Sequence, residues 1–161
     1  MVLVGVPGAG KSTVGQVLAT RLGVEFRDTD WDVERATGKT VAEVFLDEGE
    51  AAFRGYEAAQ VAAALAQHTG VLALGGGAVL DPATRAALAG HVVVHLQVSL
   101  TSASSRVGLD GARPVLALNP RSTLKALREQ RAPLYAEVAT AVVDTDGRTP
   151  AEIADMIMVL L

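Results

Sequence analysis

Short apolar runs alternate along this chain with longer segments in which apolar residues recur every third or fourth position. The short runs are rich in β-branched residues and end at glycine or polar residues, which predicts buried strands at 2–4, 24–26, 71–74, 91–98 and 141–143. The periodic segments predict helices at 11–22, 31–37, 50–68 and 99–107, with further helices starting near 40, 82, 120 and 149. Alternating strands and helices predict an α/β domain with a parallel sheet and helices on both faces.

Residues that start and stop helices mark several of these boundaries. Thr40 and Thr149 each precede a glutamate with the spacing of a capping box, and Asp81 precedes a proline that suits the first helical position. Gly23 is expected to end the first helix, and Pro133 to kink or end the helix that starts near 120. The apolar stripe of the last helix is expected to consist of Ile153, Met156, Ile157, Leu160 and Leu161.

The composition predicts a single domain spanning residues 1–161. Apolar residues make up 50% of the chain and aromatic residues 4%, which suits a packed α/β core. The absence of cysteine excludes disulfides, thiolate catalysis and Cys-bound zinc. With a net charge of -4 and no block of Lys or Arg, we expect no nucleic-acid or membrane partner. Since neither an apolar span of about 18 residues nor a signal-peptide pattern occurs, we expect a cytoplasmic protein, which we take to be a monomer.

The strongest motif is the segment 5–12, Gly-Val-Pro-Gly-Ala-Gly-Lys-Ser, called the phosphate loop below. It lies between a predicted strand and a predicted helix, which is the context that a nucleotide triphosphate site requires, because backbone N–H groups then surround the phosphates. Lys11 is expected to reach the β- and γ-phosphates of ATP, and Ser12 to bind Mg²⁺. The residues predicted to bind the nucleotide here are Gly8, Ala9, Gly10, Lys11, Ser12 and Thr13.

Two aspartates follow the second predicted strand. Asp28 and Asp30 are expected at its carboxyl end, where open parallel sheets bind ligands. We expect one carboxylate to face the metal and the other an acceptor hydroxyl. No predicted strand ends in the Asp typical of a second Walker motif, so Asp28 is the candidate metal carboxylate. The glycines at 75–77 also end a strand, which indicates close approach by a ligand or another segment.

Three arginines are candidates for binding anions. Arg131 shares a helical face with leucines, where a guanidinium is costly unless an anion meets it. Arg54 either binds an anion or forms an ordinary surface pair with Glu57. Arg113 lies in the aperiodic, glycine-containing segment 108–119, which is the candidate for a mobile lid. Arg113 is either an arginine finger that closes over the phosphates or a simple loop charge.

In combination these segments resemble the shikimate kinase family. The resemblance rests on the phosphate loop, on Asp28-Thr29-Asp30, and on four further segments in the order of that family: 50–54 (Glu-Ala-Ala-Phe-Arg), 75–79 (Gly-Gly-Gly-Ala-Val), 113–114 (Arg-Pro) and 131–135 (Arg-Ala-Pro-Leu-Tyr). It covers essentially the whole chain. It implies a five-stranded parallel sheet of the P-loop nucleoside-monophosphate-kinase type, and ATP-dependent phosphorylation of the 3-hydroxyl of shikimate within chorismate and aromatic amino-acid biosynthesis.

The resemblance also implies roles for individual residues. Asp30 would bind the acceptor hydroxyl and act as the base, in a substrate-binding helical region at about 30–60. The groups implied for the acceptor carboxylate are Arg54, Arg131 and the glycines Gly75, Gly76 and Gly77, with Gly76 acting through its backbone. Arg113 becomes the lid arginine that reaches the phosphates. Arg106 and Arg148 are expected near the adenine.

Three alternatives remain open at this point. A gluconate-type sugar-acid kinase also pairs a phosphate loop with arginines, but an Asp-Thr-Asp turn is not its pattern. A nucleoside monophosphate kinase would bind a nucleotide where shikimate is placed. A non-catalytic nucleotide-binding module would leave Asp30, Arg54 and Arg131 without a common purpose, so their convergence in a structure would count against it.

Overall fold

The computed structural model describes residues 1–110 and 120–160, with side chains at all of these positions except 107–110 and 120. In chain order the elements are β1 (Val2–Val4), α1 (Lys11–Leu22), β2 (Phe26–Asp28), α2 (Thr29–Thr37), α3 (Val41–Asp47), α4 (Gly49–Gln67), β3 (Val71–Ala73), the short 3-10 helix η1 (Ala78–Leu80), α5 (Pro82–Ala87), β4 (Val93–Gln97), α6 (Leu100–Asp110), α7 (Pro120–Val138), β5 (Ala141–Asp144) and α8 (Pro150–Val159).

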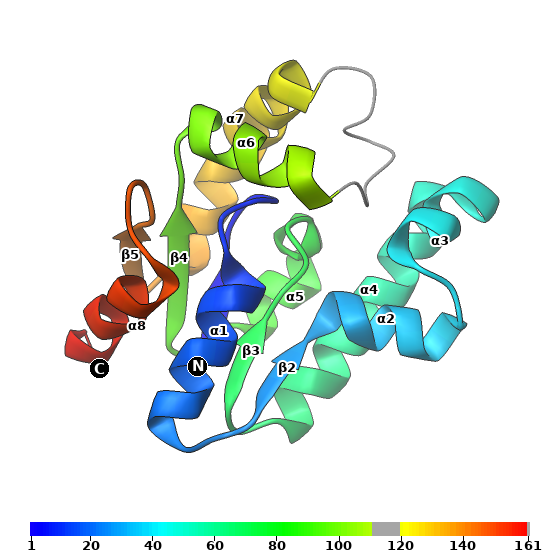
Figure 1. The fold of residues 1–161 in the computed structure, drawn as a ribbon. Coiled ribbons are helices and arrows are strands. Elements are labelled where there is room, and N and C mark those ends of the chain that lie inside the picture. Colours follow the sequence, from blue (N-terminus) through cyan, green and yellow to red (C-terminus); the bar gives the residue numbers. More distant parts are fainter. Residues whose placement is uncertain (111–119, 161) are drawn as a thin grey trace.

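The strands of the described residues form one parallel sheet of five, in the order β2-β3-β1-β4-β5. Helices α1 and α8 cover one face, and α4, α5 and α7 cover the other (Figure 1), which confirms the predicted architecture. In the register of the sheet, Asp28 is opposite Ala73 and Val4 is opposite His95. The carboxyl ends of the central strands therefore lie along one edge, where chain segments diverge and ligands bind in open sheets.

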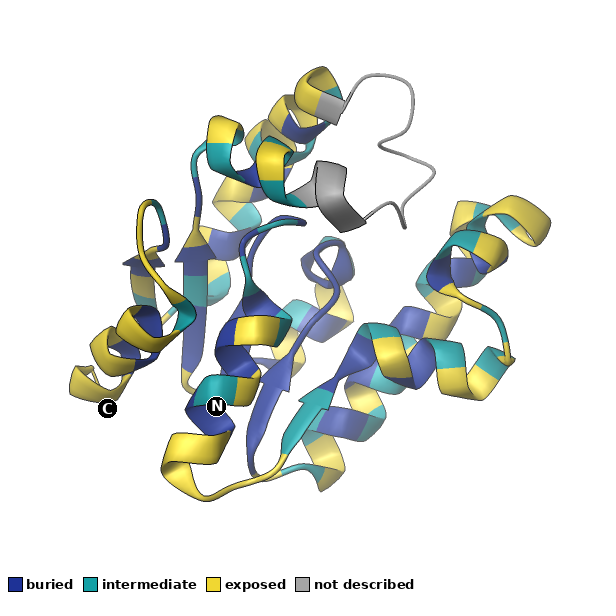
Figure 2. Cartoon of the chain, in the orientation of Figure 1, coloured by how far each residue is buried: buried dark blue, intermediate teal, exposed yellow. Residues whose placement is uncertain are grey.

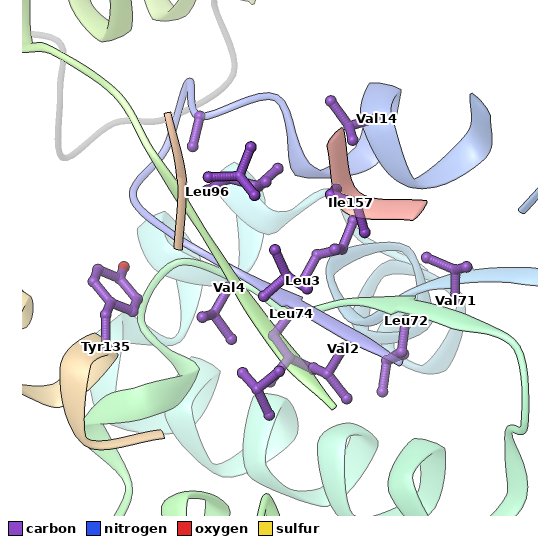
Figure 3. Packing of buried hydrophobic residues seen from close by; sticks show 14 of the residues in the cluster. Val2, Leu3, Val4, Val14, Val71, Leu72, Leu74, Leu96, Tyr135 and Ile157 are labelled. Carbon is purple, nitrogen blue, oxygen red and sulfur yellow. The ribbon is translucent and has the colours of Figure 1, made fainter. Parts of the chain in front are cut away.

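The main core surrounds β1, which is buried along its length (Figure 2). In Figure 3, Val14 of α1 and Ile157 of α8 lie on one side of this strand, and Tyr135 of α7 lies on the other. A smaller cluster holds α2 and α3 against α4, and it consists of Val33, Val41, Val44 and Phe53, with Phe45 packed against it. This second cluster fixes the helical region that forms one wall of the site described below.

The second strand begins later than predicted, because Val24 belongs to the end of α1. Its N–H donates to Ala19 O, and the Gly23 N–H donates to Thr20 O. This pair of hydrogen bonds is a Schellman motif, with Gly23 in the left-handed conformation that such a C-terminus favours. Val24 is consequently 43% exposed rather than buried in the sheet. The predicted strand at 24–26 therefore began two residues too early, because β2 starts at Phe26. Gly23 was correctly predicted as the helix end.

Three further features of the helices differ from the prediction. Helix α7 continues through Pro133 to Val138, so the proline does not end it. In α8 the buried residues are Ile153, Ala154 and Ile157, whereas Leu160 is 56% exposed, so the predicted apolar stripe was too wide. Residues 108–110 of the predicted lid form the end of α6, and the rest of it, with Arg113, lies outside the described residues.

Candidate active site

The phosphate loop connects β1 to the first turn of α1. Gly10 is the N-cap of the helix and has φ +90°, a conformation that favours glycine. Lys11 is buried, and its Nζ donates to Gly5 O at 2.9 Å and to Val6 O at 3.2 Å. The lysine ammonium and the N-terminus of a helix of this length thus concentrate positive charge at the loop, which suits a polyphosphate.

Ser12 lies in the first turn of α1, after β1, and Asp28 lies at the end of β2. These two strands are not neighbours in the sheet, since β3 lies between β1 and β2. The Ser12 hydroxyl donates to Asp28 Oδ2 at 2.6 Å, and Asp28 Oδ1 accepts from the Asp30 N–H at 3.0 Å as the N-cap of α2. Burial raises the pKa of the Asp28 carboxyl above its usual range, and the hydrogen bond from Ser12 opposes this effect. The structure therefore brings together the two residues that were predicted as metal ligands.

Asp30 is directed differently from Asp28 because the chain turns into α2 at Thr29. In an extended strand these two aspartates would share a face, so the start of the helix is what separates their side chains. Asp30 lines a cavity of about 260 Å³ beside the phosphate loop. The cavity is lined by Pro7, Asp30, Val41, Phe45, Glu50, Phe53, Arg54, Glu57, Gly76, Gly77, Leu80, Leu127, Gln130 and Arg131.

This cavity unites residues from α2, α4, α7 and the turn after β3. Among the residues predicted for the acceptor, Asp30, Arg54, Gly76, Gly77 and Arg131 all line it. Its apolar wall was not predicted, and it consists of Val41, Phe45, Phe53, Leu80 and Leu127. The cavity therefore offers cations, a carboxylate and an apolar surface within a volume suited to a small organic anion.

Arg54 is held by two glutamates. Its guanidinium hydrogen-bonds to Glu57 and to Glu50, and it lies over the rings of Phe45 and Phe53, 6.0 and 5.3 Å from their centroids. Glu57 is only 3% exposed, so of the two alternatives for Arg54 the ordinary pair on a solvated face does not hold. Burial raises the pKa of the Glu57 carboxyl, and the charge of Arg54 opposes this rise.

The sequence carried a signal for the burial of Glu57 that the prediction did not use. The buried stripe of α4 consists of Phe53, Glu57, Val61 and Ala64, so Glu57 takes a core-facing position in the helical period. A glutamate at such a position needs a charged partner. Arg54, one turn before it on α4, supplies that partner.

Arg131 lies on the buried face of α7, as predicted, and is 5% exposed. Burial lowers the pKa of its guanidinium, while Tyr135 and Glu57 favour the charged form. Arg131 Nε and Arg54 Nε are both buried without a hydrogen-bond partner among the described residues. Two guanidinium groups with unused donors therefore line the same cavity, which favours a bound anion there.

The three glycines after β3 permit close contacts with neighbouring segments, as predicted. A side chain at Gly77 would collide with the Arg54 guanidinium, and one at Gly75 would reach Glu57 and lie 2.6 Å from Asp30 Oδ1. At Gly76 it would lie 3.0 Å from Pro7 Cδ of the phosphate loop. The turn thus packs between the loop and the charged residues of the cavity.

The two arginines predicted near the adenine both contact the segment after β5. Arg106 donates to Gly8 O of the phosphate loop at 3.2 Å, and to Thr145 Oγ1 and O at 3.2 and 3.1 Å. Arg148 donates to Asp144 O and Asp146 O at 3.0 and 3.3 Å. Arg106 consequently joins the phosphate loop to the β5–α8 connection.

Comparison with known proteins decides the family. Residues 7–161 match the family model for shikimate kinase. This chain belongs to the shikimate kinase family. The shikimate kinase of Salinispora arenicola is 64% identical over 160 residues, which cover 99% of this chain and 96% of that protein. The shikimate kinase of Mycobacterium bovis is 50% identical over 158 residues, which cover 98% of this chain and 90% of that protein.

Solved structures of shikimate kinases agree with this assignment. The enzyme of Acinetobacter baumannii in complex with shikimate matches with a TM-score of 0.94 and 37% identity, over 99% of this chain and 90% of that one. A deoxyadenosine kinase from M. mycoides matches with a TM-score of 0.61 at 18% identity, which shows a shared fold only. The predicted P-loop kinase fold and the predicted family are thereby confirmed, and the chain is an ATP-dependent kinase of the shikimate kinase family.

Proposed function

We infer that this enzyme transfers the γ-phosphoryl group of ATP to the 3-hydroxyl of shikimate, giving shikimate 3-phosphate and ADP. The observation that carries this conclusion is that Asp30, Arg54 and Arg131 line one cavity beside the phosphate loop. A nucleotide-binding module without an acceptor would not need this convergence. Membership of the shikimate kinase family favours shikimate over gluconate or a nucleoside monophosphate as the acceptor.

In this proposal the two arginines and the glycine turn bind the acceptor carboxylate. A planar guanidinium donates parallel hydrogen bonds to a carboxylate, and both Arg54 and Arg131 have a buried Nε donor that no described residue uses. The substrate-binding region at about 30–60 supplies the apolar wall, including Phe45 and Phe53, against which a carbon ring packs. The acceptor hydroxyl is then held at Asp30, which takes its proton during transfer.

The phosphate loop neutralises charge on the donor side. Lys11 Nζ now donates to Gly5 O and Val6 O, and we propose that it exchanges part of this contact for the β- and γ-phosphate oxygens. The proposed nucleotide contacts also include Gly8, Ala9, Gly10, Thr13, Arg106 and Arg148. Arg113, in the segment 108–119 that the sequence predicts as a lid, remains the predicted residue that closes over the phosphates.

The predicted Mg²⁺ fits the oxygen ligands that Ser12 and Asp28 present. Their hydroxyl and carboxylate oxygens are 2.6 Å apart, and hard oxygen donors of this kind suit Mg²⁺. Among the described residues no group of three or more His, Asp or Glu side chains could hold a metal by itself. This agrees with a metal held partly by substrate phosphates, where it would neutralise charge on the transferred group. Ser12 is proposed as a direct ligand, with Asp28 orienting it.

No helix among the described residues has the length and apolarity needed to span a bilayer. A cytoplasmic location and a monomeric state remain predictions from the sequence.

The test is an ADP-release assay with shikimate, gluconate or AMP as the acceptor, and with ATP alone as the background. Shikimate should accelerate ADP release well above the background, and gluconate and AMP should not. Acceleration by gluconate or AMP in place of shikimate would assign the cavity to that acceptor instead. No acceleration by any of the three would leave the proposal without support.

A further inference from the structure

Tyr135 makes a buried polar contact that links two segments of the proposed acceptor site. It lies on α7 one helical turn after Arg131, and its side chain is 1% exposed. Its hydroxyl donates to Gly76 O at 2.6 Å, in the turn after β3. Buried tyrosine hydroxyls generally have a partner, but this partner belongs to the glycine turn that lines the cavity together with Arg131.

The same hydroxyl also interacts with the cavity arginine. Arg131 lies one helical turn before Tyr135 on α7, and its interaction with Tyr135 favours the charged guanidinium, raising the pKa of Arg131 against the effect of burial. A phenol can donate one hydrogen bond while accepting another. The Tyr135 oxygen therefore connects the Arg131 guanidinium on α7 with the Gly76 carbonyl in the turn after β3, through an interaction with the first and a hydrogen bond to the second.

Tyr135 and Gly76 are both fixed by packing. The Tyr135 ring stacks on His95 of β4, with centroids 4.8 Å apart and planes at 25°. His95 is opposite Val4 in the sheet, at the point where the chain leaves β1 for the phosphate loop. Gly76 packs against Pro7 and Gly5 of that loop, so closely that a side chain at position 76 would crowd them. The hydroxyl thus has a fixed place relative to the phosphate loop.

We propose that Tyr135 is a positioning residue whose hydroxyl sets the spacing between Arg131 and the Gly76 backbone, the two groups that grip the acceptor carboxylate. This inference rests on the proposed function. Tyr135 itself does not line the cavity, so it acts through its two partners. Without the hydroxyl, the guanidinium would lose its interaction with the Tyr135 oxygen and the Gly76 carbonyl would lose its donor, and both groups would be free to shift.

The first test is Tyr135→Phe, which keeps the ring and its stacking on His95. We expect the KM for shikimate to rise about tenfold, with a smaller fall in kcat and an unchanged KM for ATP. Tyr56→Phe is the matched control. The Tyr56 variant loses the same oxygen atom, but Tyr56 does not line the cavity and its hydroxyl donates to Glu48, the N-cap of α4, at the protein surface. The kinetic constants of this variant should therefore stay unchanged.

A double-mutant cycle separates positioning from general destabilisation. In an Arg131→Ala background, Tyr135→Phe should lower kcat/KM for shikimate by no more than about threefold, because the group that it positions is gone. Equal effects in both backgrounds, or an unchanged KM for shikimate in the single variant, would overturn the proposal. If shikimate does not accelerate ADP release by the wild-type enzyme, the proposed function itself is contradicted. The ADP-release assay of the wild type gives this result before any variant is made.

A spectroscopic test covers the case in which Tyr135→Phe does not fold. The chain has 2 tyrosines, so fluorotyrosine incorporated into the Tyr56→Phe variant labels Tyr135 alone while keeping its hydroxyl. The fluorine resonance should move when shikimate is added and should not move with gluconate at the same concentration. A resonance that stays in place at saturating shikimate would contradict the inference.

Discussion

Gly77→Ala tests the position of Arg54 with a single methyl group. A Cβ at Gly77 would overlap the Arg54 guanidinium, so the arginine must move away from its place in the cavity. The backbone itself would not be strained, because Gly77 has φ -97° and ψ -6°, which alanine adopts readily. Any effect of this substitution therefore reports on Arg54.

The expected magnitude follows from the contacts that Arg54 would lose. Its hydrogen bond to the buried Glu57 is charge-assisted, and such a bond contributes about 1.5–3 kcal/mol. Alanine restores about 0.4–1 kcal/mol by restricting the unfolded chain. The free energy of unfolding should thus fall by about 1–2 kcal/mol, which lowers the Tm by about 2–8 °C in a domain of this size.

The effect on the acceptor should be larger than the effect on stability. If the displaced Arg54 no longer donates to the substrate carboxylate, the KM for shikimate should rise by about tenfold to a hundredfold. The KM for ATP should not change, since Arg54 lies on the acceptor side of the phosphate loop. Steady-state kinetics with each substrate varied in turn, together with thermal unfolding, measure both effects.

Gly55→Ala is the control, because it adds the same methyl group to the exposed face of α4. A Cβ at Gly55 has no atom within 4 Å, so this variant should be more stable by about 0.5–1 kcal/mol, with unchanged kinetics. A normal KM for shikimate in a folded Gly77→Ala variant would refute the role of Arg54. Equal kinetic losses in both variants would show that the change is not specific to the cavity.

Three further predictions concern the reacting groups and the pH dependence. Asp30→Asn should lower kcat by about 10²–10⁴ with an unchanged Kd for ATP in equilibrium dialysis, and an unchanged kcat would remove the base assignment. Asp28→Asn should raise the Mg²⁺ concentration for half-maximal activity about tenfold or more, and an unaltered titration would exclude Asp28 from the metal site. Burial, with the charges of Lys11 and Arg128, lowers the pKa of His95 below 6.5, so the unfolded chain takes up a proton first as the pH falls and stability is lost below about pH 6.5. His95→Phe should therefore lose less stability than the wild type between about pH 7 and pH 5 in urea unfolding, whereas equal losses would show that His95 does not contribute.

The sequence predicted the elements well where local chemistry decides them. The capping boxes at Thr40 and Thr149, the N-cap at Asp81 and the stop at Gly23 all depend on contacts within a few residues, and each is present in the structure. The errors in the predicted boundaries also arise from contacts within a few residues. Val24 has the apolar character of a strand residue, but its N–H donates to Ala19 O in the C-terminal cap of α1.

The site was predictable only as far as charge and motif indicate it. Arg131 was found because a guanidinium stands on an apolar stripe, and the structure confirms that it is buried. The hydrogen bond from Tyr135 to Gly76 joins residues 59 positions apart, and no local sequence pattern predicts such a contact. The buried Glu57 lies between these cases, because its helical position was readable but its burial depends on how α4 packs.

The most direct measurement of the central claim is the position of the phosphate on the product. In the proposed site the acceptor carboxylate lies between Arg54 and Arg131, and the reacting hydroxyl lies at Asp30, with all three residues lining the cavity beside the phosphate loop. Phosphorus–proton correlation NMR of the product formed from ATP and shikimate should therefore show one phosphate ester, on the 3-hydroxyl. A phosphate on another hydroxyl, or free phosphate with no ester, would contradict this placement of the acceptor.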